Sequence, residues 1–579
     1  MAQPTEEMQE ETLTTRQETD LMIEDIRSRL LSMRRSDGMW EGFLSSSAIS
    51  TSVSVFALSL IDRDKYSALI SNGIKWLEST MKPDGSWGDS PESPSNMTAT
   101  LLSYTALYHT GHVPAVTKEH ILNTLGWDTE QKLIDGISAY YGKDLTFSVP
   151  ILTMCALARV LSSWKSITPF PFELATLPQS TFRFLNLPVV SYAIPALIAI
   201  GILQNRKRRT LMRPFRELFT AKAMRVLTRL QPDDGGFLEA APLTAFVSMC
   251  LAEGGFRDHQ VTRSCARFLE KTVREDGSWP IDTNLAGWVT SLAAKALGSD
   301  LEDRQQLADI ICRNATTSVH PFTGAAAGGW GWSNLSGSVP DGDDTSGALV
   351  ALHVLTDGKY RPEIGAGIEW LIGLQNSDGG MPTFCKGWGK LPFDRSTPDI
   401  TAHAILAMSL WKDSLPDEIK RRCSRSLDRM IRWMEKEQGG DGNWNPLWFG
   451  DQDAPDEHNL VYGAATLADY LMSSGESRAC RLAERSIRYL LESQNPDGGW
   501  GGQAGVESKV TLTARAIGAL SFCKSQSEEQ ISRGIDYLYA LYREDRLYRR
   551  EPIGLYFSRL WYSEDLYNLT FMLTALKRL

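Results

Sequence analysis

A repeated motif dominates this chain of 579 residues and limits what it can fold into. Seven times, an apolar stretch with helical spacing runs into an Asp-Gly turn and then a bulky side chain. The motifs end at Trp40, Trp87, Phe237, Trp279, Met381, Trp444 and Trp500. In each, the spacing predicts a helix and the Gly supplies the positive-φ stop. With no alternating strand runs between them, these units predict an all-α fold of toroids or solenoids.

The same repeat gives most of the 17 tryptophans a structural interpretation. We expect Trp and Gln at fixed offsets to staple successive helices, with Gln capping backbone groups.

A net charge of −10 excludes a general nucleic-acid binder, which would need a basic face. The eight cysteines form no CxxC pair, and the acidic start shows no secretory signal, so we expect a reduced, cytoplasmic protein.

The most apolar stretch, Leu187 to Leu203, is followed by the basic run Arg206 to Arg209. It is short for a membrane span and broken by prolines. Two interpretations stay open: peripheral docking on the cytoplasmic face of a membrane, or a buried core helix followed by a solvated turn.

Three carboxylates, Asp341, Asp343 and Asp344, come just before an apolar run with helical spacing. A helix N-terminus favours ionised carboxylates. In a dry pocket, however, mutual repulsion and desolvation keep at least one of them protonated. Such an acid suits protonation of an unactivated alkene, whereas an Asp-rich cap or a calcium loop would use the same residues. A second pair, Asp399 and His403, shares one helix face through its four-residue spacing.

The repeat, read as helix-Gln-x3-Gly-x-Trp, resembles the QW motif of the triterpene cyclases, the squalene–hopene and oxidosqualene cyclases. The stretches around Asp341–Asp344, TPDITAH and WFG…VYGA also resemble this family, nearly along the whole chain. The resemblance implies two α/α-barrel domains. Residues 1–34 plus 285–579 would form the catalytic barrel, and residues 35–284 an inserted second barrel.

By the same resemblance, Asp343 is the proton donor, Asp341 and Asp344 polarise and hold it, and His403 stabilises the carboxylate left behind. Aromatic faces would stabilise the migrating carbocation without trapping it. Positions matching the family's cavity, or falling close to it, are Trp288, Trp332, Trp448 and Tyr462, with Tyr556, Phe557 and Trp561 as a C-terminal cluster. No metal and no cofactor is expected.

The expected partner is a hydrophobic polyprenyl substrate, squalene or a related polyene. The oligomeric state that we expect is a homodimer. The C-terminal segment IGLYFSRLWYSEDLYNL and the loop before His403 depart from the family pattern, so ring number and substrate tail do not transfer. A prenylated aromatic and a prenyl diphosphate therefore stay open as substrates.

Two other classes compete with the cyclase. A protein prenyltransferase β-subunit would bind zinc, which Cys385, Asp399 and His403 imitate, but no Asp-x-Cys pair precedes a His in the expected arrangement. A non-catalytic repeat scaffold leaves the Asp cluster as an unexplained cost in stability.

Overall fold

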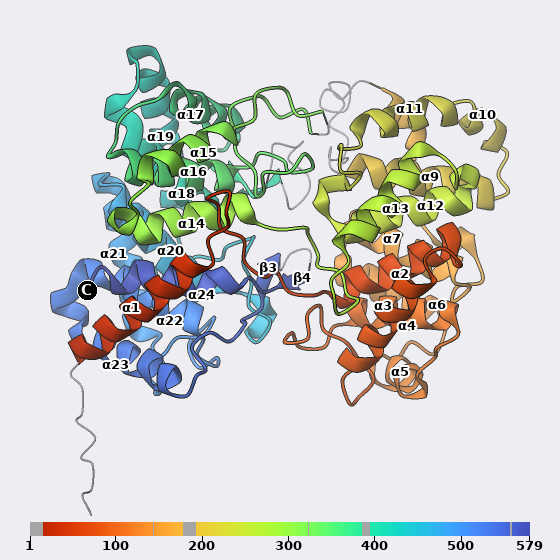
Figure 1. Ribbon diagram of the computed structural model, residues 1–579, viewed down its shortest axis with the longest axis horizontal. Coiled ribbons are helices and arrows are strands. Elements are labelled where there is room, and N and C mark those ends of the chain that lie inside the picture. The colour runs from red at the N-terminus through yellow and green to blue at the C-terminus, as the bar shows by residue number, and fades with distance from the viewer. Residues whose placement is uncertain (1–14, 143, 178–192, 322, 385–393, 556–558) are drawn as a thin grey trace, which may run out of the picture.

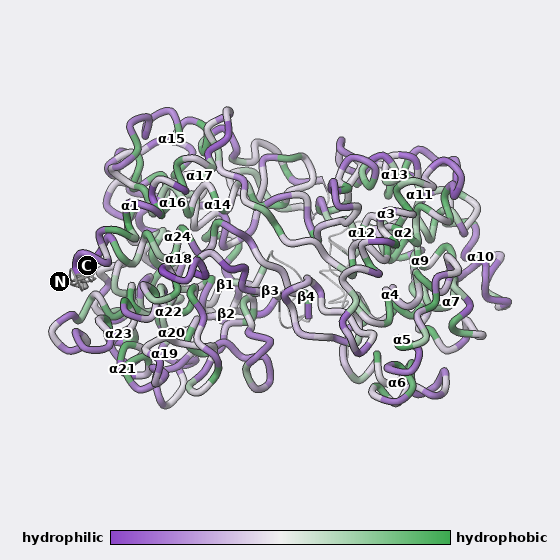
Figure 2. The backbone as a smooth tube through the Cα atoms, turned by 60° about the horizontal axis from the view of Figure 1, so that its bottom comes forward, coloured by the Kyte–Doolittle hydropathy of each residue, from purple (hydrophilic) through white to green (hydrophobic). Residues whose placement is uncertain are grey.

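A computed structural model describes residues 15–142, 144–177, 193–321, 323–384, 394–555 and 559–579. These residues form two helical lobes that lie side by side (Figure 1). Within the described ranges, no helix combines the length and the apolar character that a bilayer span requires. Apolar segments gather inside each lobe and polar segments follow its edges (Figure 2).

The larger lobe is a barrel with an inner ring of six helices. Each inner helix packs on the next, and the last returns to the first. The inner helices are α14 (Ala286–Leu297), α16 (Gly342–Thr356), α18 (Pro398–Trp411), α20 (Leu460–Ser473), α22 (Val510–Leu520) and α24 (Asp565–Leu576). The outer helices are α1 (Thr15–Ser32), α15 (Arg304–Arg313), α17 (Pro362–Leu374), α19 (Asp417–Glu437), α21 (Ser477–Glu492) and α23 (Lys524–Arg543).

The smaller lobe is a second barrel with five inner helices that close in the same way. Its inner helices are α2 (Ala48–Asp62), α4 (Met97–Thr110), α7 (Leu145–Leu157), α9 (Ile194–Lys207) and α12 (Ala241–Leu251). Around them lie α3 (Ser67–Thr80), α5 (Ala115–Glu119), α6 (Glu130–Tyr141), α10 (Arg213–Glu217), α11 (Thr220–Leu230) and α13 (Gln260–Thr272). The predicted all-α fold of two α/α barrels is confirmed.

Hydrogen bonds at the Asp-Gly turns tie neighbouring helices together. In one turn, the indole N–H of Trp500 donates to the carbonyl of Leu490 at 2.9 Å, at the end of α21. The backbone N–H of Trp500 donates to Thr513 of the next inner helix at 3.0 Å. Gln494 donates to the carbonyls of Gly498 and Gln530, each at 2.8 Å. This turn therefore joins the preceding helix to the next inner and outer helices.

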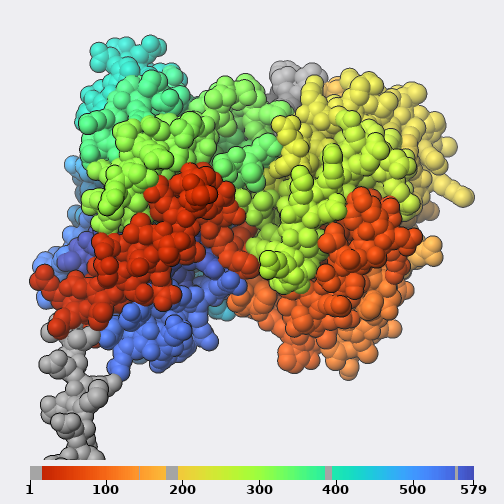
Figure 3. All heavy atoms as spheres, viewed as in Figure 1, coloured from red at the N-terminus to blue at the C-terminus, as the bar shows by residue number. Residues whose placement is uncertain are grey.

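The chain starts in the larger lobe, leaves it and returns. The first helix, α1, packs against α23 and α24 and lies across the face of the larger lobe (Figure 3). Trp40 still belongs to the larger lobe's core, whereas the core from Ala48 to Trp279 belongs to the smaller lobe. The outgoing and returning segments pair through Ser46 and Pro280. Both ends of the smaller lobe are thereby held at one place.

Two short antiparallel hairpins complete the fold. In one, β1 (Met381–Pro382) pairs with β2 (Ser396–Thr397), which leads into α18. In the other, β3 (Ile553–Leu555) pairs with β4 (Leu560–Tyr562), which precedes α24. The second hairpin lies where the lobes meet, because the backbone N–H of Trp561 donates to Asp89 of the smaller lobe at 2.7 Å.

The apolar stretch that left two interpretations open is an inner helix over its described part. Residues Ile194 to Asn205 of α9 are all buried in the smaller lobe, so the core interpretation is correct for them. Residues 187–192 lie outside the described ranges.

Candidate active site

The three carboxylates lie at the N-terminus of α16, at the end of the larger barrel that faces the smaller lobe. Val339, two residues before Asp341, packs into the smaller lobe's core. Asp341 is the N-cap, and its Oδ1 accepts hydrogen bonds from the backbone N–H groups of Asp343 at 2.9 Å and Asp344 at 2.8 Å. These bonds satisfy two of the donors that every helix start leaves free.

Burial separates the three acids into two kinds. Asp341 and Asp344 are buried, and their side chains are hydrogen-bonded to each other. Burial raises the pKa of Asp341 to about 7. Burial and the charge of Asp341 raise the pKa of Asp344 well above its ordinary value. At neutral pH this pair therefore holds a proton between its members. The side chain of Asp343, by contrast, is 21% exposed.

His403 pairs with Asp343. Its Nδ1 lies 2.6 Å from Oδ1 of Asp343, although the two residues are 60 positions apart in the chain. On α18 the ring of His403 stacks on Tyr470, with centroids 4.4 Å apart and planes 11° apart. Gly347 makes room for this arrangement, since a Cβ there would lie 2.9 Å from the Trp288 ring and 3.5 Å from His403.

Asp399 lies on the same helix as His403 but bonds elsewhere. It accepts a hydrogen bond from the hydroxyl of Thr397, and its Oδ2 has no partner among the described residues. Burial raises the pKa of Asp399 to about 7. Asp399 is thus a buried acid near the pair, while His403 uses its Nδ1 for Asp343. Cys385 lies outside the described residues.

Three of the predicted aromatic side chains contact His403 or Phe384. Trp288 meets His403 edge to face, with centroids 6.1 Å apart. Trp332 and Trp448 lie on either side of Phe384, each with its centroid 5.8 Å from that ring. Both tryptophans pack against the cores of both lobes, so this aromatic group lines the junction between the barrels.

The remaining predicted aromatics are more scattered. Tyr462 is buried on α20 against Phe449, at 4.9 Å between centroids. Trp561 is only 1% exposed, and its indole N–H has no partner among the described residues. Tyr556 and Phe557 lie outside the described residues. Neighbouring Tyr562 is half-buried and lies within electrostatic reach of Asp343 and Asp344.

Two further aromatic side chains belong to this site, Tyr470 and Phe384, and neither was among the predicted positions. Tyr470 stands eight residues after Tyr462 and therefore shares its face of α20, a spacing that could have identified it. Phe384 sits just after the β1 strand, where no periodic pattern marks it.

The two α/α barrels have the fold of the class II terpene cyclases. The structure resembles ent-copalyl diphosphate synthase from Streptomyces platensis, with a TM-score of 0.58, 15% identity, and coverage of 97% of this chain and 99% of that one. At that identity the likeness speaks for the fold alone.

Sequence comparison gives the family. The model of the squalene-hopene cyclase C-terminal domain matches residues 322–579, and that of the N-terminal domain matches residues 23–127. Together they cover more than half of the chain, which belongs to the squalene–hopene cyclase family.

Three curated relatives carry different names. Enfumafungin synthase from Hormonema carpetanum is 25% identical over 567 residues, which is 80% of this chain and 41% of that protein. Drimenyl diphosphate synthase from Streptomyces showdoensis is 28% identical over 290 residues, 48% of each chain. A squalene–hopene cyclase from Bradyrhizobium diazoefficiens is 25% identical over 282 residues, 43% of this chain and 40% of that protein. The matches span less than half the length of these relatives.

Proposed function

We propose that this protein catalyses the protonation-initiated cyclisation of a long polyprenyl substrate, squalene or a related polyene, to a polycyclic terpenoid. The observation that carries the proposal is the 2.6 Å contact between Asp343 and His403 beside the buried pair Asp341 and Asp344. Asp343 is the member of the three with an accessible side chain, so it is the one that substrate can reach.

In the proposed mechanism, His403 donates its Nδ1–H to Oδ1 of Asp343, and Oδ2 carries the reactive proton. The O–H bond breaks as the π electrons of the terminal alkene form a C–H bond, which leaves a tertiary cation. Asp343 becomes a carboxylate, which the N–H of His403 stabilises where the charge develops. Asp341 and Asp344, as a proton-sharing pair, keep the neighbouring charge low.

The cation then migrates through successive ring closures. Each closure uses the π electrons of the next alkene and moves the charge along the chain. The faces of Trp288, Trp332, Trp448 and Tyr462 are proposed to stabilise these cations, at about 0.5–2 kcal/mol for each ring. Loss of a proton or capture of water ends the cascade, and Asp343 regains its proton from solvent.

We also propose that residues 1–34 plus 285–579 form the catalytic domain and that residues 35–284 are inserted into it. The division is supported by the separate cores of the two lobes and by the pairing of Ser46 with Pro280, where the chain leaves and returns; the core position of Trp40 moves the first boundary to between Trp40 and Ala48.

A prenyl diphosphate is the second candidate substrate, since drimenyl diphosphate synthase is among the relatives. A prenylated aromatic is the third. To separate them, the purified protein is incubated in detergent with squalene, a prenylated aromatic acid, and farnesyl and geranylgeranyl diphosphate. Mass spectrometry then identifies the products. We expect one substrate to give a cyclic isomer or its hydrate, and folded protein that cyclises none of them would refute the proposal.

Contact with a membrane is proposed for a surface at α10, at the edge of the smaller lobe (Figure 1). Leu211 is fully exposed, Leu218 is 77% exposed, and Phe215 lies between them. The basic residues Arg208, Arg209 and Arg213 are close in the chain. Exposed apolar side chains beside basic ones suit an anionic lipid surface.

Sedimentation with vesicles tests this contact. The protein should sediment with vesicles that contain phosphatidylserine and less with phosphatidylcholine alone. The triple variant Leu211→Ser, Phe215→Ser, Leu218→Ser should stay in the supernatant, whereas Val319→Ser, at a site 65% exposed on the other lobe, should bind like the wild type. Equal sedimentation of the triple variant would refute the docking surface.

A further inference from the structure

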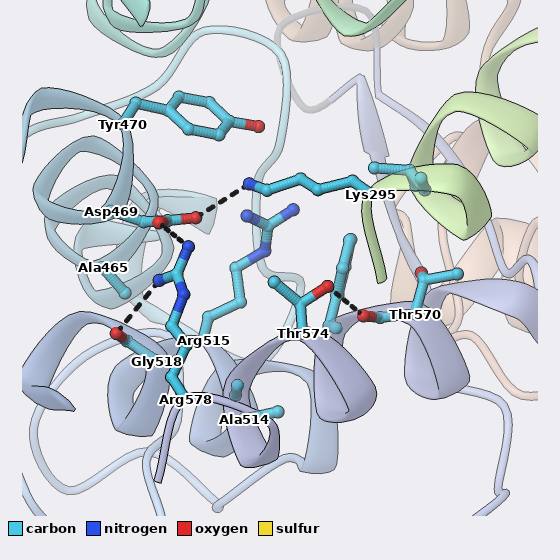
Figure 4. Close-up of a pocket in the computed structure, with 13 residues that line it drawn as sticks. Lys295, Ala465, Asp469, Tyr470, Ala514, Arg515, Gly518, Thr570, Thr574 and Arg578 are labelled. Carbon is cyan, nitrogen blue, oxygen red and sulfur yellow. Dashed lines mark hydrogen bonds and ion pairs between the residues drawn. The ribbon is translucent and has the colours of Figure 1, made fainter. Parts of the chain in front are cut away.

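Four charged side chains lie together inside the larger barrel, below Tyr470 (Figure 4). Lys295 of α14 and Arg578, just after α24, both pair with Asp469 of α20, at 3.1 and 2.6 Å. Arg515 of α22 lines the same cavity, which has a volume of about 30 Å³. We refer to Lys295, Asp469, Arg515 and Arg578 as the floor cluster. Its cavity has room for about two water molecules.

Arg515 is the member of the floor cluster that has no carboxylate of its own. Its guanidinium lies over the rings of Phe571, at 3.7 Å, and Tyr462, at 4.9 Å. It also acts electrostatically on Tyr470, while its Nε has no partner among the described residues. Three cations thus face a single carboxylate, and the floor cluster is net positive. Such a net positive, half-buried cluster attracts an anion that forms within its reach.

A short stack connects the floor cluster to the proton donor. Lys295 lies over the Tyr470 ring at 5.0 Å, and Arg515 acts electrostatically on the same tyrosine. Tyr470 stacks on His403, which contacts Asp343. Arg515 and Asp343 both act electrostatically on Tyr462 and Tyr470. The cations and the acid therefore lie on neighbouring layers of the barrel and are only partly exposed to solvent, so their charges are screened less than in bulk water.

We propose that Arg515, with the rest of the floor cluster, is a positioning residue that stabilises the carboxylate of Asp343 after proton transfer and keeps the carbocation away from the barrel floor. This inference rests on the proposed function. Before proton transfer, the three cations of the floor cluster face only the carboxylate of Asp469. After transfer, the carboxylate of Asp343 adds a second negative charge. The positive field of the floor cluster repels a cation, which therefore travels toward the aromatic group at the junction of the lobes.

The pH dependence must account for every charged group around Asp343. These are Asp341 and Asp344 on α16, Asp399 and His403 on α18, Tyr462 and Tyr470 on α20, Arg515 on α22, Lys295 on α14 and Tyr562 on β4. The carboxyl groups and tyrosines are neutral or negative, so Lys295 and Arg515 supply the positive field. Removing Arg515 should let Asp343 keep its proton to higher pH.

Two substitutions at one position test the charge. Arg515→Met should lower turnover by about tenfold. The substrate is the one identified above among squalene, the prenylated aromatic and the two diphosphates. Arg515→Met should also move the alkaline limb of the pH–rate profile to higher pH. Arg515→Lys, which keeps the charge, should restore most of the rate and the original limb. Arg225→Met, on the outside of the smaller lobe, is the matched control and should change neither.

A second readout needs no substrate. With histidine labelled with carbon-13 at Cε1, the resonance of His403 is identified by its loss in His403→Ala. Its titration midpoint should lie about one pH unit higher in Arg515→Met than in the wild type, and unchanged in Arg515→Lys. If Met unfolds the protein, Lys295→Met removes a neighbouring cation and should shift the resonance in the same direction.

The results separate the two proposals. Absence of any cyclised product refutes the proposed function and leaves the His403 titration as the test of the floor cluster. The inference would be overturned if Arg515→Met folds but leaves the His403 titration and the alkaline limb of the pH–rate profile unchanged. It would also be overturned if Arg515→Lys behaves like Arg515→Met. Circular dichroism verifies the fold of each variant.

Discussion

Two tryptophans that stand two residues apart contact quite different partners. Trp330 is buried and donates its indole N–H to the carbonyl of Ile311 at 2.7 Å, as Trp500 of the repeat does to Leu490. Trp332 instead lies at the junction of the lobes beside Phe384. Tryptophans of this chain therefore serve either the packing of the helices or the junction of the lobes. Only their contacts in the structure tell these two kinds apart.

His403 offers the first prediction at this scale. His403→Ala should lower turnover by about 10²–10³-fold, because the carboxylate of Asp343 loses a donor positioned where charge develops. The products should keep the same ring pattern, since His403 holds the acid and does not line the path of the cation. Chromatography of the products with a rate measurement checks both. A changed ring pattern would contradict this role.

Gly347 carries the second prediction. In Gly347→Ala the new Cβ meets the Trp288 ring at 2.9 Å and His403 at 3.5 Å, so one of them has to move. We expect a loss of about 1–3 kcal/mol in unfolding free energy, together with slower turnover. Gly373→Ala on α17 is the control, since nothing lies within 4 Å of the added Cβ, and it should be neutral or slightly stabilising. Equal stability of the two variants would argue against tight packing at Gly347.

At the scale of elements, the turn hydrogen bonds hold the barrel helices in place. Trp500→Phe keeps an aromatic ring but removes the N–H that satisfies Leu490. The carbonyl of Leu490 keeps only the 3.2 Å hydrogen bond from the backbone N–H of Ser493, and the lost indole bond should destabilise the protein by about 1 kcal/mol. Denaturant titration of the variant measures this loss. Trp164→Phe, at a half-buried site outside the repeats, should cost less, and the reverse order would contradict the stapling role.

Helices were predictable from the sequence, and the floor cluster was not. The repeat placed helices before its turns, because apolar periodicity and Asp-Gly stops are local signals. Lys295, Asp469 and Arg515 each stand alone in an otherwise apolar inner helix. That isolation is the signal that could have identified them. Which buried charges meet, however, depends on how six helices close into a ring, and no local pattern encodes it.

The candidate site also has features that the sequence predicts and features that it does not. The Asp cluster at a helix start could be predicted from its cap position, and the contact of Asp343 with His403 agrees with the expectation from the resemblance. The four-residue spacing of Asp399 and His403 suggested a pair, but Asp399 bonds Thr397. Contacts across 60 residues, such as that of Asp343 with His403, come from the packing of α16 on α18.

At the scale of the whole molecule, the contact between the lobes should depend on pH. Ser333 of the larger lobe donates to Glu239 of the smaller lobe at 2.8 Å. Burial, with the charge of Asp282, raises the pKa of Glu239 to about 9. The folded protein therefore holds a proton that the unfolded chain releases near pH 4.5, so stability falls as pH rises from about 4.5 to 9.

Thermal unfolding of Glu239→Gln tests this dependence. The variant has no group to titrate at this position, so its unfolding temperature should fall less between pH 5 and pH 9 than that of the wild type. Glu302→Gln, at an exposed position, should follow the wild type. Identical pH profiles for the wild type and Glu239→Gln would exclude Glu239 as the source.

Initiation by a proton from Asp343 is the central claim, and isotope incorporation tests it most directly. The reaction is run in D2O with the substrate identified above, for the wild type and for Asp343→Asn. Because the acid exchanges with solvent, the wild-type product should carry one deuterium on the carbon that was protonated. Asp343→Asn should give no cyclic product while keeping its helical circular dichroism. A cyclic product without carbon-bound deuterium, or an active Asp343→Asn protein, would contradict the account.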